Sequence, residues 1–306
     1  MPQYIFRKNN KNYIKAITGN AIYYNFSTGY YATPSVSIAD IYGNGTANGN
    51  GNSVNYNYGA DWNGQDGNLT TVGTNGSPSP FGTYDQSGQV WEWNDDALLT
   101  ARGVGGGSWL NSVGYIGSSF MGYSGAGPLF GNANVGFRIA ANEYETSTLL
   151  NLVLIYYPNN ASDTTGYGSV GYKYNIGKFP VTNTQYCQFL NLKALSDPYG
   201  LYNSNMGSNV RGGITRSGSS GSYSYTVKTN MGNKPVVYIS WFDAARFCNW
   251  MHNNMGTGST ENGSYNLNGA LSGVFYKNNG ARFWIPTGNE WYKAAYYNPN
   301  KQYLIR

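Results

Sequence analysis

Side chains suited to redox or nucleophilic chemistry are scarce in this chain of 306 residues, which holds two cysteines, Cys187 and Cys248, and one histidine, His252. Cys248 lies seven residues after Trp241, a spacing that places both on the buried face of a predicted helix. Free cysteine is also among the most often buried residue types. We therefore favour core packing for both cysteines, over a disulfide between them and over a metal site. His252 follows the same predicted helix, where an imidazole suits the C-terminal dipole. With no second histidine, zinc binding and Ser-His-Asp catalysis are not expected.

Two other patterns have a chemical interpretation. Acidic residues gather at Asp85, Glu92 and Asp95, but a glycosidase needs two carboxylates facing a cleft, and no such pair is singled out. Residues 103–107 are rich in glycine, yet they lack the Lys-Ser/Thr and the strand–loop–helix context of a phosphate-binding loop. We interpret them as a tight turn and expect Ser108 and the tryptophan after it to continue as a strand.

Six motifs give a more specific interpretation. Three lie in the first half of the chain, at 82–93, at 106–109 (Gly-Gly-Ser-Trp) and at 136–138 (Gly-Phe-Arg). They resemble the C-terminal half of a formylglycine-generating-enzyme (sulfatase-modifying factor) domain. The other three lie in the second half, at 180–186, 235–245 and 286–291 (Pro-Thr-Gly-Asn-Glu-Trp). They resemble the N-terminal half of the same domain.

In the family the second set of motifs comes first, so the resemblance implies a circularly permuted domain. Residues 1–141 would correspond to the family's C-terminal half and residues 149–306 to its N-terminal half, joined at 142–148 into one domain. Similar stretches at 10–14 and 300–304 occupy the same place in the family, just after the Glu-Trp helix. Chain ends that lie close together make permutation tolerable. The alternative is one period of a tandem array, whose half-domains pair head to tail between copies.

The resemblance implies an α+β, C-type-lectin-like fold that is rich in loops, with three short helices around short antiparallel sheets. Capping boxes predict that the helices begin after Thr182, Ser240 and Thr287, because a Gln, Asp or Glu follows each of them three residues later. The first helix should run from residue 183 to about residue 192.

Strands and loops are predicted from composition. Strands are expected within 149–157 and 173–179. The Asn/Gly-rich stretch 43–60 is expected to be a surface loop that holds no packed strand. Together with 212–226 it is our candidate for a binding face.

The resemblance also locates a catalytic site. Formylglycine-generating enzymes are copper-dependent oxidases that convert a peptidyl cysteine of a sulfatase to formylglycine, and their two active-site cysteines follow the Gly-Gly-Ser-Trp motif. Those positions are Asn111 and Ile116 here, and neither supplies the thiolate that Cu(I) requires. Ser108 matches a family active-site serine and Trp109 ends the motif, but a serine alone has no redox chemistry. We therefore expect a degenerate site, no copper and no oxidase reaction.

A calcium ion is the cofactor that the resemblance allows, since the family binds calcium with the segment around Val-Trp-Glu-Trp. Gln89, Val90 (through its carbonyl) and Glu92 are the ligands that carry over, although Gln89 stands where the family has Asn. Asn94 and Asp95 could add oxygens, which Ca²⁺ prefers. The alternative is a framework role, in which the two tryptophans of the segment fill the core and Glu92 satisfies buried backbone.

Composition limits the function classes. Charged residues make up 11% of the chain and the net charge is +5, so no extended basic face for nucleic acid is expected. No apolar run is long enough for a membrane span or resembles a secretory signal. Aromatic residues reach 16%, and Tyr, Ser, Gly and Asn dominate the loops, as in many recognition surfaces.

We therefore predict a non-catalytic binding or structural module that recognises a glycan or a protein surface. The alternatives are a divergent formylglycine-generating oxidase and a self-assembling structural or virion protein. A monomer is expected in the first case and head-to-tail assembly in the last. An extracellular, cell-surface or virion setting would suit the module, while its ligand and its compartment do not follow from the sequence.

Overall fold

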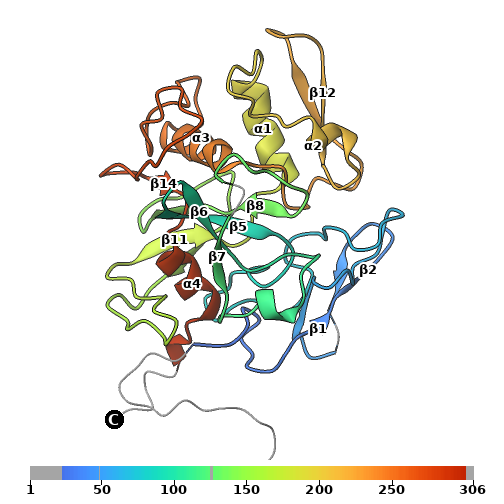
Figure 1. Ribbon diagram of the computed structural model, residues 1–306, viewed down its shortest axis with the longest axis vertical. Coiled ribbons are helices and arrows are strands. Elements are labelled where there is room, and N and C mark those ends of the chain that lie inside the picture. Colours follow the sequence, from blue (N-terminus) through green and yellow to red (C-terminus); the bar gives the residue numbers. More distant parts are fainter. Residues whose placement is uncertain (1–22, 48, 125–126, 301–306) are drawn as a thin grey trace, which may run out of the picture.

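The computed structural model describes residues 23–47, 49–124 and 127–300 (Figure 1). Its elements are short and joined by long loops, and the fold is mixed α+β, as predicted. Two four-stranded sheets form the centre. The first has the order β7-β6-β5-β8 and comprises β5 (Trp91–Leu98), β6 (Ala101–Gly105), β7 (Met121–Tyr123) and β8 (Val135–Phe137).

The second sheet joins the two halves of the chain. Its order is β10-β11-β9-β14, and its members are β9 (Ala140–Asn142), β10 (Leu152–Ile155), β11 (Tyr174–Gly177) and β14 (Phe283–Trp284). All its pairs are antiparallel, with Tyr174 opposite Asn142 and Trp284 opposite Ala140. Strands β10 and β11 lie within the two stretches predicted from composition. The connection between β9 and β10 is short because both strands belong to this one sheet.

Three two-stranded sheets lie outside the centre. They are β1 (Ser35–Val36) with β4 (Ser53–Val54), β2 (Ile38–Ala39) with β3 (Gly45–Thr46), and β12 (Ile214–Ser217) with β13 (Ser224–Val227). Most sheets are antiparallel, as expected, but β1–β4 and β5–β8 are parallel pairs. In Figure 1, β12 lies at the upper edge of the molecule and β1 and β2 at its lower right.

The three predicted helices are confirmed as α1 (Asn183–Lys193), α3 (Trp241–His252) and α4 (Gly288–Tyr296). Each begins with a complete capping box, in which the N-cap side chain and the side chain three residues later satisfy each other's backbone N–H groups. The structure adds a short helix α2 (Asn205–Ser208) and a 3-10 turn η1 (Val113–Tyr115), which the capping pattern did not predict.

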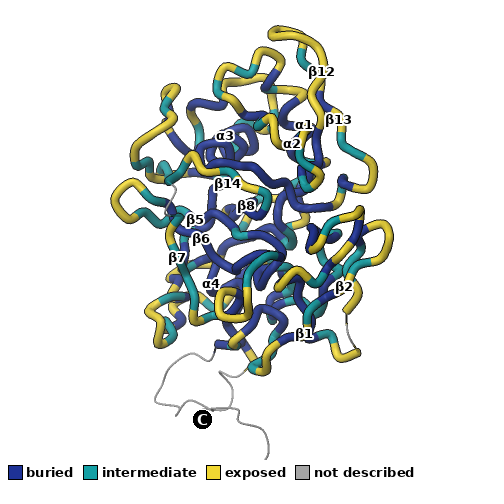
Figure 2. Tube along the Cα trace, turned by 45° about the vertical axis from the view of Figure 1, so that its right-hand side comes forward, coloured by how far each residue is buried: buried dark blue, intermediate teal, exposed yellow. Residues whose placement is uncertain are grey.

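Aromatic side chains from both halves of the chain build one core. Phe137, next to Arg138 at the end of β8, packs edge-on against Tyr186 of α1 and Phe247 of α3, with ring centroids 6.3 and 5.4 Å apart. The indole N–H of Trp93 donates to the carbonyl of Ile239 at 2.8 Å. Figure 2 shows buried backbone through the centre and exposed backbone at the outer loops. Burial of these rings is the main stabilising contribution.

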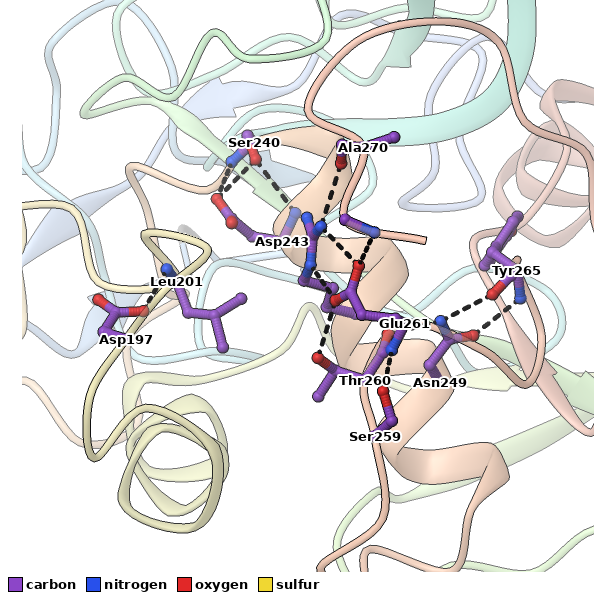
Figure 3. Close-up of polar contacts among 12 residues, drawn as sticks. Asp197, Leu201, Ser240, Asp243, Asn249, Ser259, Thr260, Glu261, Tyr265 and Ala270 are labelled. Carbon is purple, nitrogen blue, oxygen red and sulfur yellow. Dashed lines mark hydrogen bonds and ion pairs between the residues drawn. The ribbon is translucent and has the colours of Figure 1, made fainter. Parts of the chain in front are cut away.

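A polar network fixes the loop after α3 (Figure 3). Arg246 donates to both carboxylate oxygens of Glu261, at 2.7 and 3.0 Å, and to the carbonyl of Ala270. Asn249 of α3 donates to the carbonyls of Thr260 and Tyr265. Because these groups are buried, their hydrogen bonds offset the cost of removing them from water. The loop is therefore anchored although it contains no regular element.

The expectation that 43–60 holds no packed strand is wrong. Residues 45–46 and 53–54 form strands, and the chain from Asn52 to Tyr56 is buried. Two contributions bury this stretch. Val54 and Tyr56 pack in an apolar cluster with Ile116, and Asn55 donates to the carbonyl of Asn68 and to the side chain of Gln89. An Asn-rich stretch can therefore be buried when its N–H donors find acceptors and its apolar residues pack.

Candidate functional site

Two glycines turn the chain at the start of the site. Strand β6 ends at Gly105, and Gly106 and Gly107 follow with φ of 92° and 68°. A Cβ on Gly107 would lie 2.8 Å from Cγ2 of Ile116, so this position requires glycine. The tight turn is therefore as predicted. The strand expected beyond it at Ser108 is wrong, because a second turn follows at once, closed by the N–H of Asn111 and the carbonyl of Ser108 at 3.0 Å.

Ser108 is fully buried and bound on both sides by amides. Its hydroxyl donates to Oδ1 of Asn111 at 2.5 Å and accepts from Nδ2 of Asn134 at 3.2 Å. Within the described ranges, no imidazole, carboxylate or amine contacts this hydroxyl to take its proton. A serine nucleophile needs such a base, and the two amides that contact Ser108 do not provide one.

Ile116, at the second cysteine position, belongs to a small apolar cluster with Phe26, Val54 and Tyr56, all of them buried. Its side chain offers no ligand atom, and the amide of Asn111 is a hard donor. Cu(I) prefers soft thiolate ligands. The residues present therefore do not fit copper.

Trp109 is buried and held from three directions. Its indole N–H donates to the carbonyl of Ala133 at 3.3 Å, Tyr58 packs edge-on at 5.6 Å between ring centroids, and the Arg211 guanidinium lies 4.3 Å from the ring centroid. Arg211 also donates to the carbonyl of Gly67 at 2.8 Å. This residue from the second half thus locks a loop of the first half beside the site.

Beside this turn, three aromatic residues form what we call the aromatic surface: Trp91, Tyr115 and Phe120. Their ring centroids lie 4.9 to 6.3 Å apart, with interplanar angles of 54° to 80°. Tyr115 is 42% exposed, and the other two are partly exposed. The backbone N–H of Trp91 donates to the carbonyl of Asn134 at 2.8 Å. Asn134 therefore connects the aromatic surface to Ser108.

The expectation that both tryptophans of the Val-Trp-Glu-Trp segment fill the core holds for one of them. Trp93 is fully buried, whereas Trp91 is only partly buried. Residues two apart in a strand point to the same face, so Trp91 and Trp93 share one face of β5 and the alternation does not explain their different burial. Trp91 stands at the start of the strand, where Tyr115 and Phe120 cover it incompletely.

The predicted calcium ligands are engaged by the protein itself. Glu92 accepts two hydrogen bonds from Arg138 and one from the indole of Trp291, and all three residues are fully buried. Gln89 donates to the carbonyl of Thr70 at 2.6 Å, and its oxygen accepts from the same residue and from Asn55.

Val90, the third predicted ligand, is fully buried. Both carboxylate oxygens of Glu92 already accept from protein donors, whereas calcium needs six to eight oxygens. The side chains present therefore do not fit a calcium ion. Glu92 instead has the framework role, with a charged partner rather than backbone groups.

The other candidate residues of the acidic segment also contact protein groups. Asp95 pairs with Arg102 at 3.2 Å, and burial raises the pKa of its carboxyl to about 8. Asn94 is buried and accepts from the N–H of Asp96. Asp85 accepts from Gly73 and Asn75, and burial raises its pKa. Across the described residues, no three His, Cys, Asp or Glu side chains are grouped so that they could hold a metal ion.

Cys187 and Cys248 are both buried and free, so core packing, the favoured interpretation, is confirmed over a disulfide. Burial raises the pKa of both thiols, which keeps them protonated and unreactive. His252 is the last residue of α3, and its Nδ1 accepts from the N–H of Arg282 at 3.2 Å. Burial lowers its pKa.

The structure thus brings together Ser108, Trp109 and Asn111, and separates Ile116 into its own cluster. Sequence reasoning missed Asn134, Arg211 and the aromatic surface. No spacing rule links Asn134 to Ser108, because their contact arises from the pairing of β5 with β8. Tyr115 and Phe120 lie within a few residues of the Gly-Gly-Ser-Trp motif, and their aromatic character was the one local signal.

Comparison with known families agrees with this geometry. The chain belongs to the sulfatase-modifying factor enzyme 1-like domain family, whose model matches residues 37–143 and 169–304. The family predicted from the six motifs is therefore confirmed, and so is the mixed α+β fold. No curated protein and no solved structure matches the chain. None of the helices in the described part of the chain is both long and apolar enough to traverse a bilayer.

Proposed function

We propose that this domain is a non-catalytic recognition module of its family, which binds a ligand over the aromatic surface of Trp91, Tyr115 and Phe120. The observation that carries the proposal is the state of Ser108. Its hydroxyl is committed to Asn111 and Asn134, and thus lacks a base. The family's catalytic position therefore supports a neighbouring surface instead of a reaction.

Exposed rings next to fixed polar groups favour recognition. Large aromatic side chains contribute contact area at a low cost in conformational entropy. Tyr115 is 42% exposed, yet its ring centroid lies 4.9 Å from that of Phe120 and 6.3 Å from that of Trp91. The rings are thus both accessible and ordered, as a preorganised binding surface requires.

We also propose that the domain is circularly permuted, which keeps this surface within a single chain. Strand β9 precedes the 142–148 joint and pairs with β11 beyond it. At the other side of the domain, Tyr23 bridges Tyr297, and the N–H of Tyr24 donates to the carbonyl of Tyr296 at 2.8 Å. The segments on either side of the joint are therefore neighbours, and so are the segments near the two ends of the domain, as a permutation requires.

Arrays of glycans and peptides probed with the purified protein test the recognition proposal. We expect a defined set of ligands that the wild type binds and that Tyr115→Ser no longer binds. Tyr144→Ser is the matched control, because Tyr144 is 85% exposed and lies in the joint. Equal binding by wild type and Tyr115→Ser would place recognition elsewhere on the domain.

A divergent oxidase is the alternative, and it has its own test. The protein is incubated with a cysteine-containing sulfatase peptide, Cu(I) and oxygen, and the peptide is analysed by mass spectrometry. We expect the cysteine to remain unchanged. Conversion to formylglycine at a rate that depends on Ser108 would contradict a non-catalytic role.

A further inference from the structure

The hydrogen bonds of Ser108 fix the orientation of the Asn111 amide. Nδ2 of Asn134 donates to the hydroxyl, so the hydroxyl proton points to its remaining neighbour, the side chain of Asn111. Only the oxygen of an amide can accept that proton. The Oδ1 atom of Asn111 therefore faces inward, at 2.5 Å from Ser108, and its Nδ2 is directed away from Ser108.

This arrangement leaves two N–H donors of Asn111 without a partner among the described residues. Asn111 is partly exposed, so these donors are open to solvent rather than orphaned in the core. Its main chain is fixed as well, since its carbonyl accepts from the N–H of Asn57 at 3.0 Å. A preoriented donor that no protein group uses suits an acceptor on a ligand.

Asn111 is linked to the aromatic surface through Ser108 and Asn134, whose carbonyl accepts from the N–H of Trp91. Tyr115 follows Asn111 by one turn of chain, and its ring is inclined at 80° to that of Trp91 and at 67° to that of Phe120. Rings at such angles present a face and an edge side by side. Arg211, a charged residue beside Trp109, is already engaged by that ring and by the carbonyl of Gly67.

We infer that the ligand of the aromatic surface is a neutral saccharide, whose hydroxyl oxygens accept from Nδ2 of Asn111 while its C–H face packs on the rings. This inference rests on the proposed function. An anionic ligand would find the guanidinium of Arg211 already engaged, and burial of an unpaired charge is unfavourable. A sugar ring offers both acceptors and polarised C–H groups, which an aromatic face attracts.

Asn111 is thus the residue that determines specificity, and Ser108 is a positioning residue. Asn111→Asp tests the first role, because the aspartate still accepts from Ser108 but loses both donors. The probe is a set of immobilised neutral oligosaccharides, with the free methyl glycosides of glucose, galactose, mannose and N-acetylglucosamine as competitors. We expect neutral saccharides to bind the wild type, and Asn111→Asp to weaken binding by about tenfold.

Ser108→Ala and Ser108→Thr test the positioning role. The alanine frees the amide to rotate, so saccharide binding should fall, while threonine keeps the hydroxyl and should restore it. Circular dichroism of each variant verifies folding. A merely structural serine would change the melting temperature without this difference in affinity at a temperature where both variants are folded.

The outcomes separate this inference from the proposed function. Binding of neutral saccharides that depends on both Tyr115 and Asn111 supports it. Binding that depends on Tyr115 but is confined to peptides or anionic glycans overturns the saccharide class and leaves recognition intact. Neutral-saccharide binding that Asn111→Asp leaves unchanged overturns the role of Asn111 and also leaves recognition intact. Binding that Tyr115→Ser leaves unchanged overturns both. The absence of any neutral-saccharide binding overturns the inference as well.

Discussion

Glu92 and Arg138 form a two-point ion pair at the centre of the domain. Nη2 of Arg138 lies 2.6 Å from Oε1 of Glu92, and Nε lies 2.5 Å from Oε2. Both side chains are fully buried. The two residues lie on or just after β5 and β8, a parallel pair, and the indole of Trp291 from α4 donates to the same carboxylate at 2.7 Å. One carboxylate thus connects the sheet to a helix from the other half of the chain.

Removing this charge should destabilise the domain strongly. In Glu92→Gln the guanidinium of Arg138 stays buried without its counter-ion, and breaking such a pair costs about 3–5 kcal/mol. Urea denaturation followed by tryptophan fluorescence measures the free energy of unfolding. Glu143→Gln is the control, because Glu143 lies in the joint and forms no ion pair in the described part of the chain.

Calcium dependence distinguishes this pair from a metal ligand. We expect EDTA to leave the midpoint of wild-type unfolding unchanged, since Arg138 already neutralises Glu92. A fall in stability on EDTA addition that Glu92→Gln abolishes would show instead that Glu92 holds a metal ion.

One side chain contacts the joint at three backbone carbonyls. Nδ2 of Asn175 on β11 lies 3.1 to 3.2 Å from the carbonyl oxygens of Asn142, Glu143 and Glu145. Asn175→Ala leaves these acceptors without their donor, and we expect a loss of about 1–3 kcal/mol. Cleavage by a Glu-specific protease after residues 143 and 145 should accelerate. Asn151→Ala, at an exposed position, is the control and should behave as wild type.

Stability should fall as pH rises from about 4 to about 8. Burial raises the pKa of Asp95 to about 8 and that of Asp243 to about 7, whereas an unfolded aspartate titrates near 3.9. Between those values the folded state binds more protons than the unfolded state, so raising the pH favours unfolding. Thermal melts across this range measure the slope.

Asp95→Asn isolates one contribution to that slope. The substitution keeps an oxygen that can accept from Arg102 but removes the titrating carboxyl, so it should flatten the decline between about pH 4 and pH 8. Lys234 and Lys293, whose pKa burial lowers to about 8, act above this window, where deprotonation favours folding. A slope identical in wild type and Asp95→Asn would show that Asp95 does not titrate in this range.

The two cysteines should not react with thiol reagents until the protein unfolds. Both are buried and free, so a thiol reagent should react with neither in the native state and with both in denaturant. Addition of a reductant should leave the melting temperature unchanged. A melting temperature that drops in reductant would point to a disulfide.

Local signals predicted the helices well because capping is a local interaction. Thr182 with Gln185, Ser240 with Asp243 and Thr287 with Glu290 each lie within four residues, and each pair makes the contacts that its spacing predicts. The family motifs likewise predicted the family and, with it, the mixed α+β fold.

Long-range contacts explain what the sequence did not predict. Asn55 and Gln89 are separated by 34 positions, yet their hydrogen bond buries a stretch whose Asn/Gly composition suggests a loop. Asn134 reaches Ser108 across 26 positions. The exposure of Trp91 depends on how far Tyr115 and Phe120 cover it, which no periodicity encodes. Such contacts depend on how distant segments pack together rather than on local composition.

Hydrogen–deuterium exchange with a bound array ligand tests the central claim most directly, because it locates recognition on the chain. We predict that the ligand protects backbone amides in 91–93 and 111–120, the segments of the aromatic surface and its turn. Protection confined to 43–60 or 212–226, with 111–120 unchanged, would contradict a recognition site at the aromatic surface.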